Sequence, residues 1–194
     1  MKSFLKLLTL VLIANLAVSC SNDDDATVPP PVNEEEVITT LTVTFMPQGG
    51  GTIVELKTQD LDGDGPDAPV VTVLGSFQAN TTYTGAVEFL NELENPAEDI
   101  TEEVAEEALE HQVFFNVTNN LGAVTYNDLD SDGNPIGLDV TFQTADTGTP
   151  INGAMTVTLR HDPNKGAAGV SDGDITNAGG ETDIETTFTP ITVE

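Results

Sequence analysis

The feature that most constrains the fold of this chain is a two-residue alternation of apolar and polar side chains. In residues 40–45, Leu41, Val43 and Phe45 share one face, and three threonines occupy the other. This pattern is typical of a strand that is buried on one side only. A glycine-rich turn follows, and the alternation resumes in residues 52–58. The chain therefore predicts a β-hairpin at the start of its folded part.

The alternation recurs at regular spacing along the rest of the chain. The further segments are 70–73, 83–89, 113–117, 123–126, 136–142, 155–159 and 184–188. Pro190 shifts the phase of the last segment, which predicts an edge strand or a β-bulge there. Eight or nine short strands joined by Gly, Asn and Asp predict an all-β fold, an immunoglobulin-like Greek-key β-sandwich.

One stretch interrupts the alternation and predicts a short acidic helix or loop near residues 99–111. Asp99 has the character of an N-cap residue at its start. If the helix continued far enough, Glu103, Glu107 and His111 would share one face and could bind Zn²⁺ or Fe²⁺. The alternative is a solvated acidic face, with His111 at the start of the next strand. His161, which precedes Asp162, gives a weaker signal for a metal site.

Two aspartate-rich loops predict calcium sites. The first resembles the calcium loop of EF-hand-like motifs, with oxygen-bearing residues at alternating positions and a glycine at the sixth. Its candidate ligands are Asp128, Asp130, Asp132, Asn134 and Asp139. The second loop repeats half of the pattern, with Asp60, Asp62, Asp64 and Asp67 as candidate ligands. In both loops the alternative is an ordinary Asp–Gly turn between strands.

The N-terminal residues predict export and a lipid anchor. Lys2 and Lys6 precede a short apolar run, and residues 16–20 (LAVSC) resemble a bacterial lipoprotein box. We expect residues 1–19 to be a signal peptide and Cys20 to carry the lipid. Residues 20–36 would then form an acidic, Pro-rich tether to a single domain at 37–194. The aspartates after Cys20 resemble a signal for the outer face of the outer membrane.

The charge of the chain excludes one class of partner. Without the signal peptide, 33 acidic residues stand against three basic ones, Lys57, Arg160 and Lys165. Nucleic-acid binding requires Lys or Arg to neutralise phosphates, so we expect no nucleic-acid partner. Such a chain attracts cations and basic proteins. No nucleophile elbow or phosphate-binding glycine loop is present, and we expect no enzymatic activity.

Several segments also resemble a family of small acidic lipoproteins from Bacteroidota. They are residues 34–40 (EEEVITT), 89–92 (FLNE), 110–112 (EHQ) and 179–184 (GGETDI). Members of that family often carry the label "type 1 periplasmic binding fold superfamily protein", and some are encoded near TonB-dependent receptors. That label implies alternating strands and helices, whereas the residues of this chain predict strands almost throughout.

Together these features predict a surface-anchored, non-enzymatic lipoprotein that binds divalent cations. The resemblance implies an accessory role in the uptake of a metal or nutrient by a TonB-dependent receptor. Two alternatives remain at this point: an adhesive or structural module that Ca²⁺ stiffens, and a carbohydrate-binding module.

Overall fold

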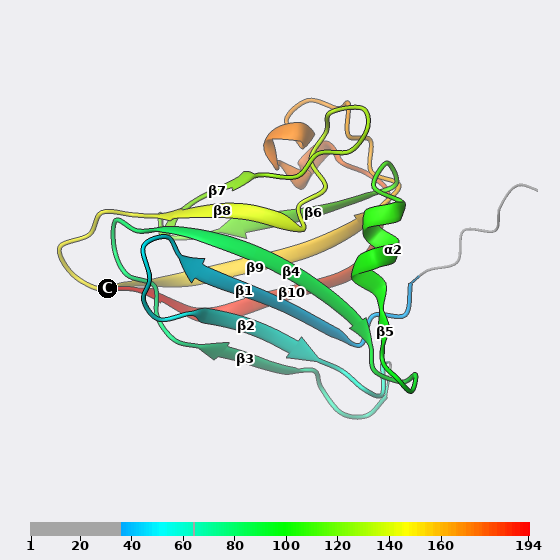
Figure 1. Cartoon of the computed structure of the whole chain (residues 1–194), viewed down its shortest axis with the longest axis horizontal. Coiled ribbons are helices and arrows are strands. Elements are labelled where there is room, and N and C mark those ends of the chain that lie inside the picture. Colours follow the sequence, from blue (N-terminus) through cyan, green and yellow to red (C-terminus); the bar gives the residue numbers. More distant parts are fainter. Residues whose placement is uncertain (1–35, 64) are drawn as a thin grey trace, which may run out of the picture. The chain divides into compact units, whose positions relative to one another are not determined.

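Strands are the main secondary structure of the described chain and form two antiparallel sheets (Figure 1). The structure is a computed structural model that describes residues 36–63 and 65–194. The predicted signal peptide, Cys20, its tether as far as residue 35, and Asp64 lie outside the described residues. Within the described ranges, no helix has the length and apolar character needed to cross a membrane.

The larger sheet has a Greek-key core. Its strands are β1 (Thr40–Pro47), β2 (Val54–Gln59), β3 (Val70–Leu74), β4 (Thr82–Asn91), β5 (Glu98–Asp99), β7 (Gly122–Tyr126) and β8 (Asp139–Thr144). They follow the order β3-β2-β1-β4-β8-β7, and β5 pairs with β4. The first three strands form a meander, and β4 returns to pair with β1, which is the Greek-key order.

The smaller sheet contains β6 (His111–Val117), β9 (Ile151–His161) and β10 (Glu181–Val193), in the order β10-β9-β6. The inward side chains of both sheets form one apolar core, which includes Leu41, Phe45, Phe142 and Leu159. Phe77 lies in the β3–β4 connection, and its backbone pairs with the end of β10, so that the two sheets meet there.

The prediction of an all-β sandwich is confirmed, with ten strands in place of eight or nine. The additional one is β5, a two-residue strand too short for alternation to reveal. The prediction of an edge strand or a bulge at Pro190 is also confirmed, because β10 lies at the edge of its sheet and its register against β9 shifts between Phe188 and Ile191.

The acidic segment forms a helix that is shorter than the metal hypothesis required. Helix α2 (Ile100–Glu106) begins at Asp99, whose side chain accepts a hydrogen bond from the Thr101 backbone N–H at 3.0 Å. Only two of its residues, Ile100 and Val104, are buried. The helix ends at Glu106, and a turn leads into β6. An extension of the helix to His111 is therefore wrong, and that residue starts the next strand.

Candidate metal centre

The two histidines of the chain lie side by side in the smaller sheet. His111 begins β6 and His161 ends β9, and the antiparallel register places them directly opposite one another. Opposed residues of neighbouring strands bring their side chains together on the same face. The two imidazole rings are 4.5 Å apart at their centroids, and both side chains are buried.

A β-bulge brings Asp183 to the same place. In the pairing of β10 with β9, Thr182 opposes Arg160 and Ile184 opposes Leu159, so Asp183 is the extra residue. A bulge bends the strand and re-aims the side chain of the additional residue. The Asp183 carboxylate lies beside His161, with Oδ1 at 3.9 Å from Nδ1, and is 1% exposed.

Glu36 supplies the second carboxylate from the segment that precedes β1. Its Oε1 is 2.8 Å from Nε2 of His111, and its Oε2 is 3.4 Å from Nδ1 of His161. The side chain is 6% exposed. We predicted residues 20–36 as a tether, but the structure includes Glu36 in the folded body, at its buried charged centre.

Glu36, His111, His161 and Asp183 thus form a cluster, here called the inner cluster. One ligand-type atom of each lies within 4.8 Å of the others. Around a tetrahedral ion with bonds of about 2.0–2.2 Å, ligand atoms stand roughly 3.3–3.6 Å apart. The contacts of 2.8, 3.4 and 3.9 Å bracket that spacing. The spacing of these atoms is therefore compatible with coordination of one ion.

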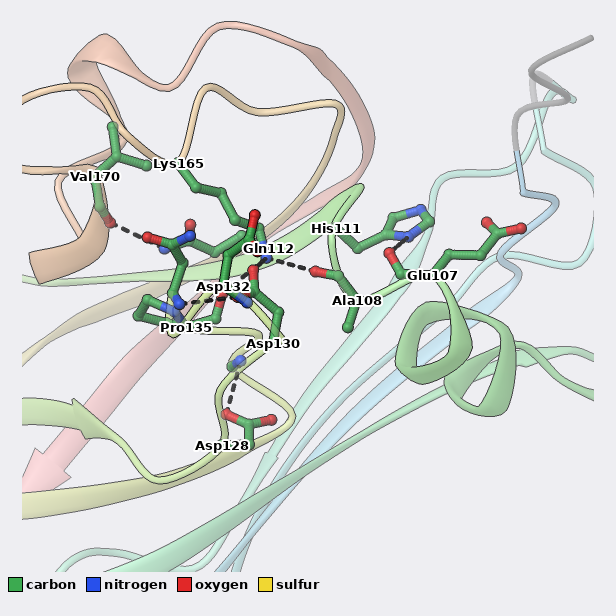
Figure 2. Close-up of polar contacts among 12 residues, drawn as sticks. Glu107, Ala108, His111, Gln112, Asp128, Asp130, Asp132, Pro135, Lys165 and Val170 are labelled. Atoms are coloured by element: carbon green, nitrogen blue, oxygen red, sulfur yellow. Dashed lines mark hydrogen bonds and ion pairs between the residues drawn. The ribbon is translucent and has the colours of Figure 1, made fainter. Parts of the chain in front are cut away.

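The two ring nitrogens of His111 have different partners. Its Nδ1 lies 3.3 Å from the carbonyl oxygen of Glu107 (Figure 2), a contact in which the ring N–H donates. A histidine that ligates a metal commonly donates its other ring nitrogen to such a carbonyl, which fixes the tautomer and the ring orientation. Nε2 of His111 faces Oε1 of Glu36 at 2.8 Å, whereas the buried Nε2 of His161 makes no hydrogen bond to any described residue.

The electrostatics of the inner cluster favour a cation. It combines two carboxylates with two imidazoles. Burial alone would lower the pKa of His161, but the hydrogen bond and charge of Glu36, together with Asp183 and Asp162, raise it. The negative field reaches α2, where burial, Glu98 and Glu36 raise the pKa of Glu103.

The structure separates the three residues of the predicted transition-metal face. Only His111 belongs to the inner cluster. Among the described residues, the carboxylates of Glu103 and Glu107 do not join any cluster of possible metal ligands. Glu107 contributes its backbone carbonyl instead of its carboxylate. Sequence reasoning missed Glu36 and Asp183 and gave His161 little weight. The alternation of β9 offered a signal, since residues 155, 157 and 159 point inward and residue 161 follows in phase.

In the first predicted calcium loop, a lysine of the chain supplies the positive charge (Figure 2). The ammonium of Lys165 donates to Oδ2 of Asp130 at 2.9 Å and to the carbonyls of Ala108 and Pro135 at 2.6 and 3.0 Å. Burial alone would raise the pKa of Asp130. The hydrogen bond from Lys165 and those from two backbone N–H groups outweigh this effect and lower it.

Two aspartates of this loop, Asp128 and Asp130, also accept backbone hydrogen bonds. Oδ1 of Asp130 accepts from the N–H groups of Asp132 and Asn134, both at 2.9 Å. Asp128 accepts three more, from residues 137–139. The side chain of Asp139 accepts from the amide of Asn127 at 2.8 Å. Five predicted calcium ligands are therefore brought into one loop, but the loop is already closed by internal hydrogen bonds.

The second predicted calcium loop lies on the surface between β2 and β3. Oδ1 of Asp60 accepts from the N–H groups of Asp62 and Gly63, at 3.3 and 3.0 Å, and Oδ2 of Asp62 accepts from the N–H of Asp67 at 3.3 Å. These are the contacts of a self-bonded turn. Calcium binding remains a prediction for both loops.

Comparison of the chain with protein-family models, with curated proteins and with solved structures finds no match. Functional conclusions therefore depend on the geometry and chemistry of the chain itself.

Proposed function

We propose that this protein binds a divalent transition-metal ion, with Zn²⁺ as the best fit, through Glu36, His111, His161 and Asp183. The observation that carries the proposal is the convergence of two imidazoles and two carboxylates, all buried, from four separate segments of the chain. Buried charged groups are costly unless they are paired or coordinate a metal.

The donor types favour Zn²⁺ over a hard cation. Two nitrogen and two oxygen ligands in a roughly tetrahedral arrangement are typical of zinc, whereas Ca²⁺ takes six to eight oxygens. Fe²⁺ shares the preference for imidazole and carboxylate and is the second candidate. A bound dication would also balance the two carboxylates. At Asp130, the ammonium of Lys165 already provides that balance.

The proposed setting of this binding is the cell exterior. The lipoprotein box at Cys20 and the acidic residues after it support a lipid anchor in the outer membrane, with the domain outside the cell. In this setting the domain would collect the ion close to the membrane. The resemblance to Bacteroidota lipoproteins supports transfer to a TonB-dependent receptor as the next step.

Calorimetric titration of the purified, metal-free protein with Zn²⁺, Fe²⁺ and Ca²⁺ tests the proposal. We expect one site for Zn²⁺, with affinity reduced at least about tenfold in Asp183→Asn and His111→Ala, because each substitution removes one ligand. Glu103→Gln is the matched control, since it removes a carboxylate of the predicted helix face that lies outside the inner cluster. Loss of binding in the control, or wild-type protein that takes up no Zn²⁺ or Fe²⁺, would refute the proposal.

A further inference from the structure

We infer that the ion reaches the inner cluster through a second, exposed coordination position formed by Glu110 and Asp162, with His161 shared between the two positions. This inference rests on the proposed function, because it concerns the route to the same site. Glu110, His161 and Asp162 each offer a ligand-type atom, and these atoms lie within 4.8 Å of one another. Both carboxylate residues are exposed, whereas His161 is buried.

The backbone holds the two exposed carboxylate residues next to each other. The N–H of Asp162 donates to the carbonyl of Glu110 at 2.7 Å, which continues the pairing of β6 with β9 by one residue. Asp162 adopts a φ of 49°, a left-handed conformation that is uncommon outside glycine. Such conformations persist only where the surrounding structure maintains them.

Gly180 provides part of that surrounding structure. It has a φ of 69°, and a Cβ at this position would stand 2.1 Å from the carbonyl oxygen of His161 and 2.9 Å from the backbone of Asp162. Only glycine allows this approach. The chain before β10 therefore packs directly on the backbone that presents both His161 and Asp162.

The inner cluster needs such an intermediate position because it is closed to solvent. All four side chains are at most 6% exposed, so a hydrated ion cannot approach them directly. His161 belongs to both groups, its Nδ1 faces Glu36 and Asp183, and its buried Nε2 has no hydrogen-bonding partner among the described residues. The exposed carboxylates can replace water ligands of the ion before it moves inward, and His161 offers a ligand atom to both positions.

The surface next to Glu110 also favours cations. An open pocket of about 320 Å³ is lined by Glu106, Glu107, Ala108, Leu109, Glu110 and Ser131. Three acidic residues around one concave surface raise the local concentration of cations and the rate at which they arrive. Glu110 therefore belongs both to the lining of this pocket and to the exposed coordination position.

Stopped-flow measurement of Zn²⁺ association and dissociation tests the route. In the double variant Glu110→Gln/Asp162→Asn we expect both rate constants to fall about tenfold and the equilibrium affinity to change less than threefold. Asn is chosen because it tolerates the left-handed conformation. A position on the route lowers the barrier in both directions, so removing it slows both steps equally.

Glu106→Gln/Glu107→Gln is the matched control, because it removes two nearby charges outside the three-residue group. We expect its association rate to fall less than that of the test variant. Unchanged rates, an equal effect in the control, or faster dissociation with an unchanged association rate would overturn the inference. Wild-type protein that binds no Zn²⁺ would instead refute the proposed function.

Discussion

Buried carboxylates occur in two clusters of the sandwich, and different groups lie beside them in each cluster. In one, Asp130 is paired with the ammonium of Lys165, which also donates to two backbone carbonyls. In the other, Glu36 and Asp183 lie beside the imidazoles of His111 and His161. The chain thus supplies an ammonium group at the first cluster, whereas the second cluster combines its carboxylates with imidazoles.

The two clusters are also linked through the chain. Ala108, whose carbonyl accepts from Lys165, lies in the turn between α2 and β6, three residues before His111. The turn is therefore fixed at one end by the internal cation, and at the other end it presents His111 and Glu110. An ammonium that belongs to the chain stabilises the fold without any added ion, whereas a site filled by a metal ion would make stability depend on the supply of that ion.

We expect the largest effect from a substitution that breaks the ion pair between Lys165 and Asp130. Lys165→Met leaves the buried carboxylate of Asp130 without its partner and should lower the free energy of unfolding by about 3–5 kcal/mol. Chemical denaturation followed by circular dichroism measures this loss. Lys57→Met, a substitution on a partly exposed strand position, is the control and should cost less than about 1 kcal/mol. Equal losses in the two variants would show that the Lys165–Asp130 pair has no special role.

The next effect concerns the inner cluster, where we propose that an ion binds. Zn²⁺ at about one hundred times its dissociation constant should stabilise the wild-type protein by roughly 2.7 kcal/mol, through binding to the native state only. Thermal unfolding with and without Zn²⁺ measures the shift. His111→Ala should abolish it, whereas Glu103→Gln should retain it. A full shift in His111→Ala would mean that Zn²⁺ stabilises the fold from another site.

A smaller effect is the pH dependence of stability that Asp130 causes. The folded-state pKa of Asp130 is lowered, so its contribution to stability is present above the unfolded pKa of about 3.9 and is lost as pH falls through the folded value. We therefore expect the free energy of unfolding to fall more steeply with acidification below pH 4 in the wild type than in Asp130→Asn. Urea denaturation at several pH values gives both slopes, and parallel slopes would contradict the assignment.

The smallest effect is expected at an exposed residue of the same loop. The backbone N–H of Asp132 is bonded to Asp130, but its side chain is exposed, so Asp132→Ala should change stability by at most about 0.5 kcal/mol without calcium. Repeating the thermal unfolding in millimolar Ca²⁺ sharpens the comparison. A calcium-dependent stabilisation that disappears in Asp132→Ala would support the predicted calcium site, and its absence would leave Lys165 as the cation of this loop.

The sequence predicted the strands of the fold more completely than the residues of the candidate metal centre. Alternation located nearly every strand, because an inward-facing side chain must recur every second residue wherever one face is buried. It also placed the bulge at Pro190. It missed the bulge at Asp183, where no proline or glycine marks the extra residue. The sequence also could not show that α2 ends at Glu106, since the glutamates beyond it are as compatible with a helix as those within it.

The sequence by itself determined the class of fold, the acidic character and the ligand types available, because these follow from local periodicity and composition. Only the tertiary structure decided which ligands meet. Strand register paired His111 with His161, although 50 positions separate them, a bulge turned Asp183 inward, and the segment before β1 delivered Glu36. Such convergence depends on contacts between distant parts of the chain, about which the spacing of residues along a single strand carries no information.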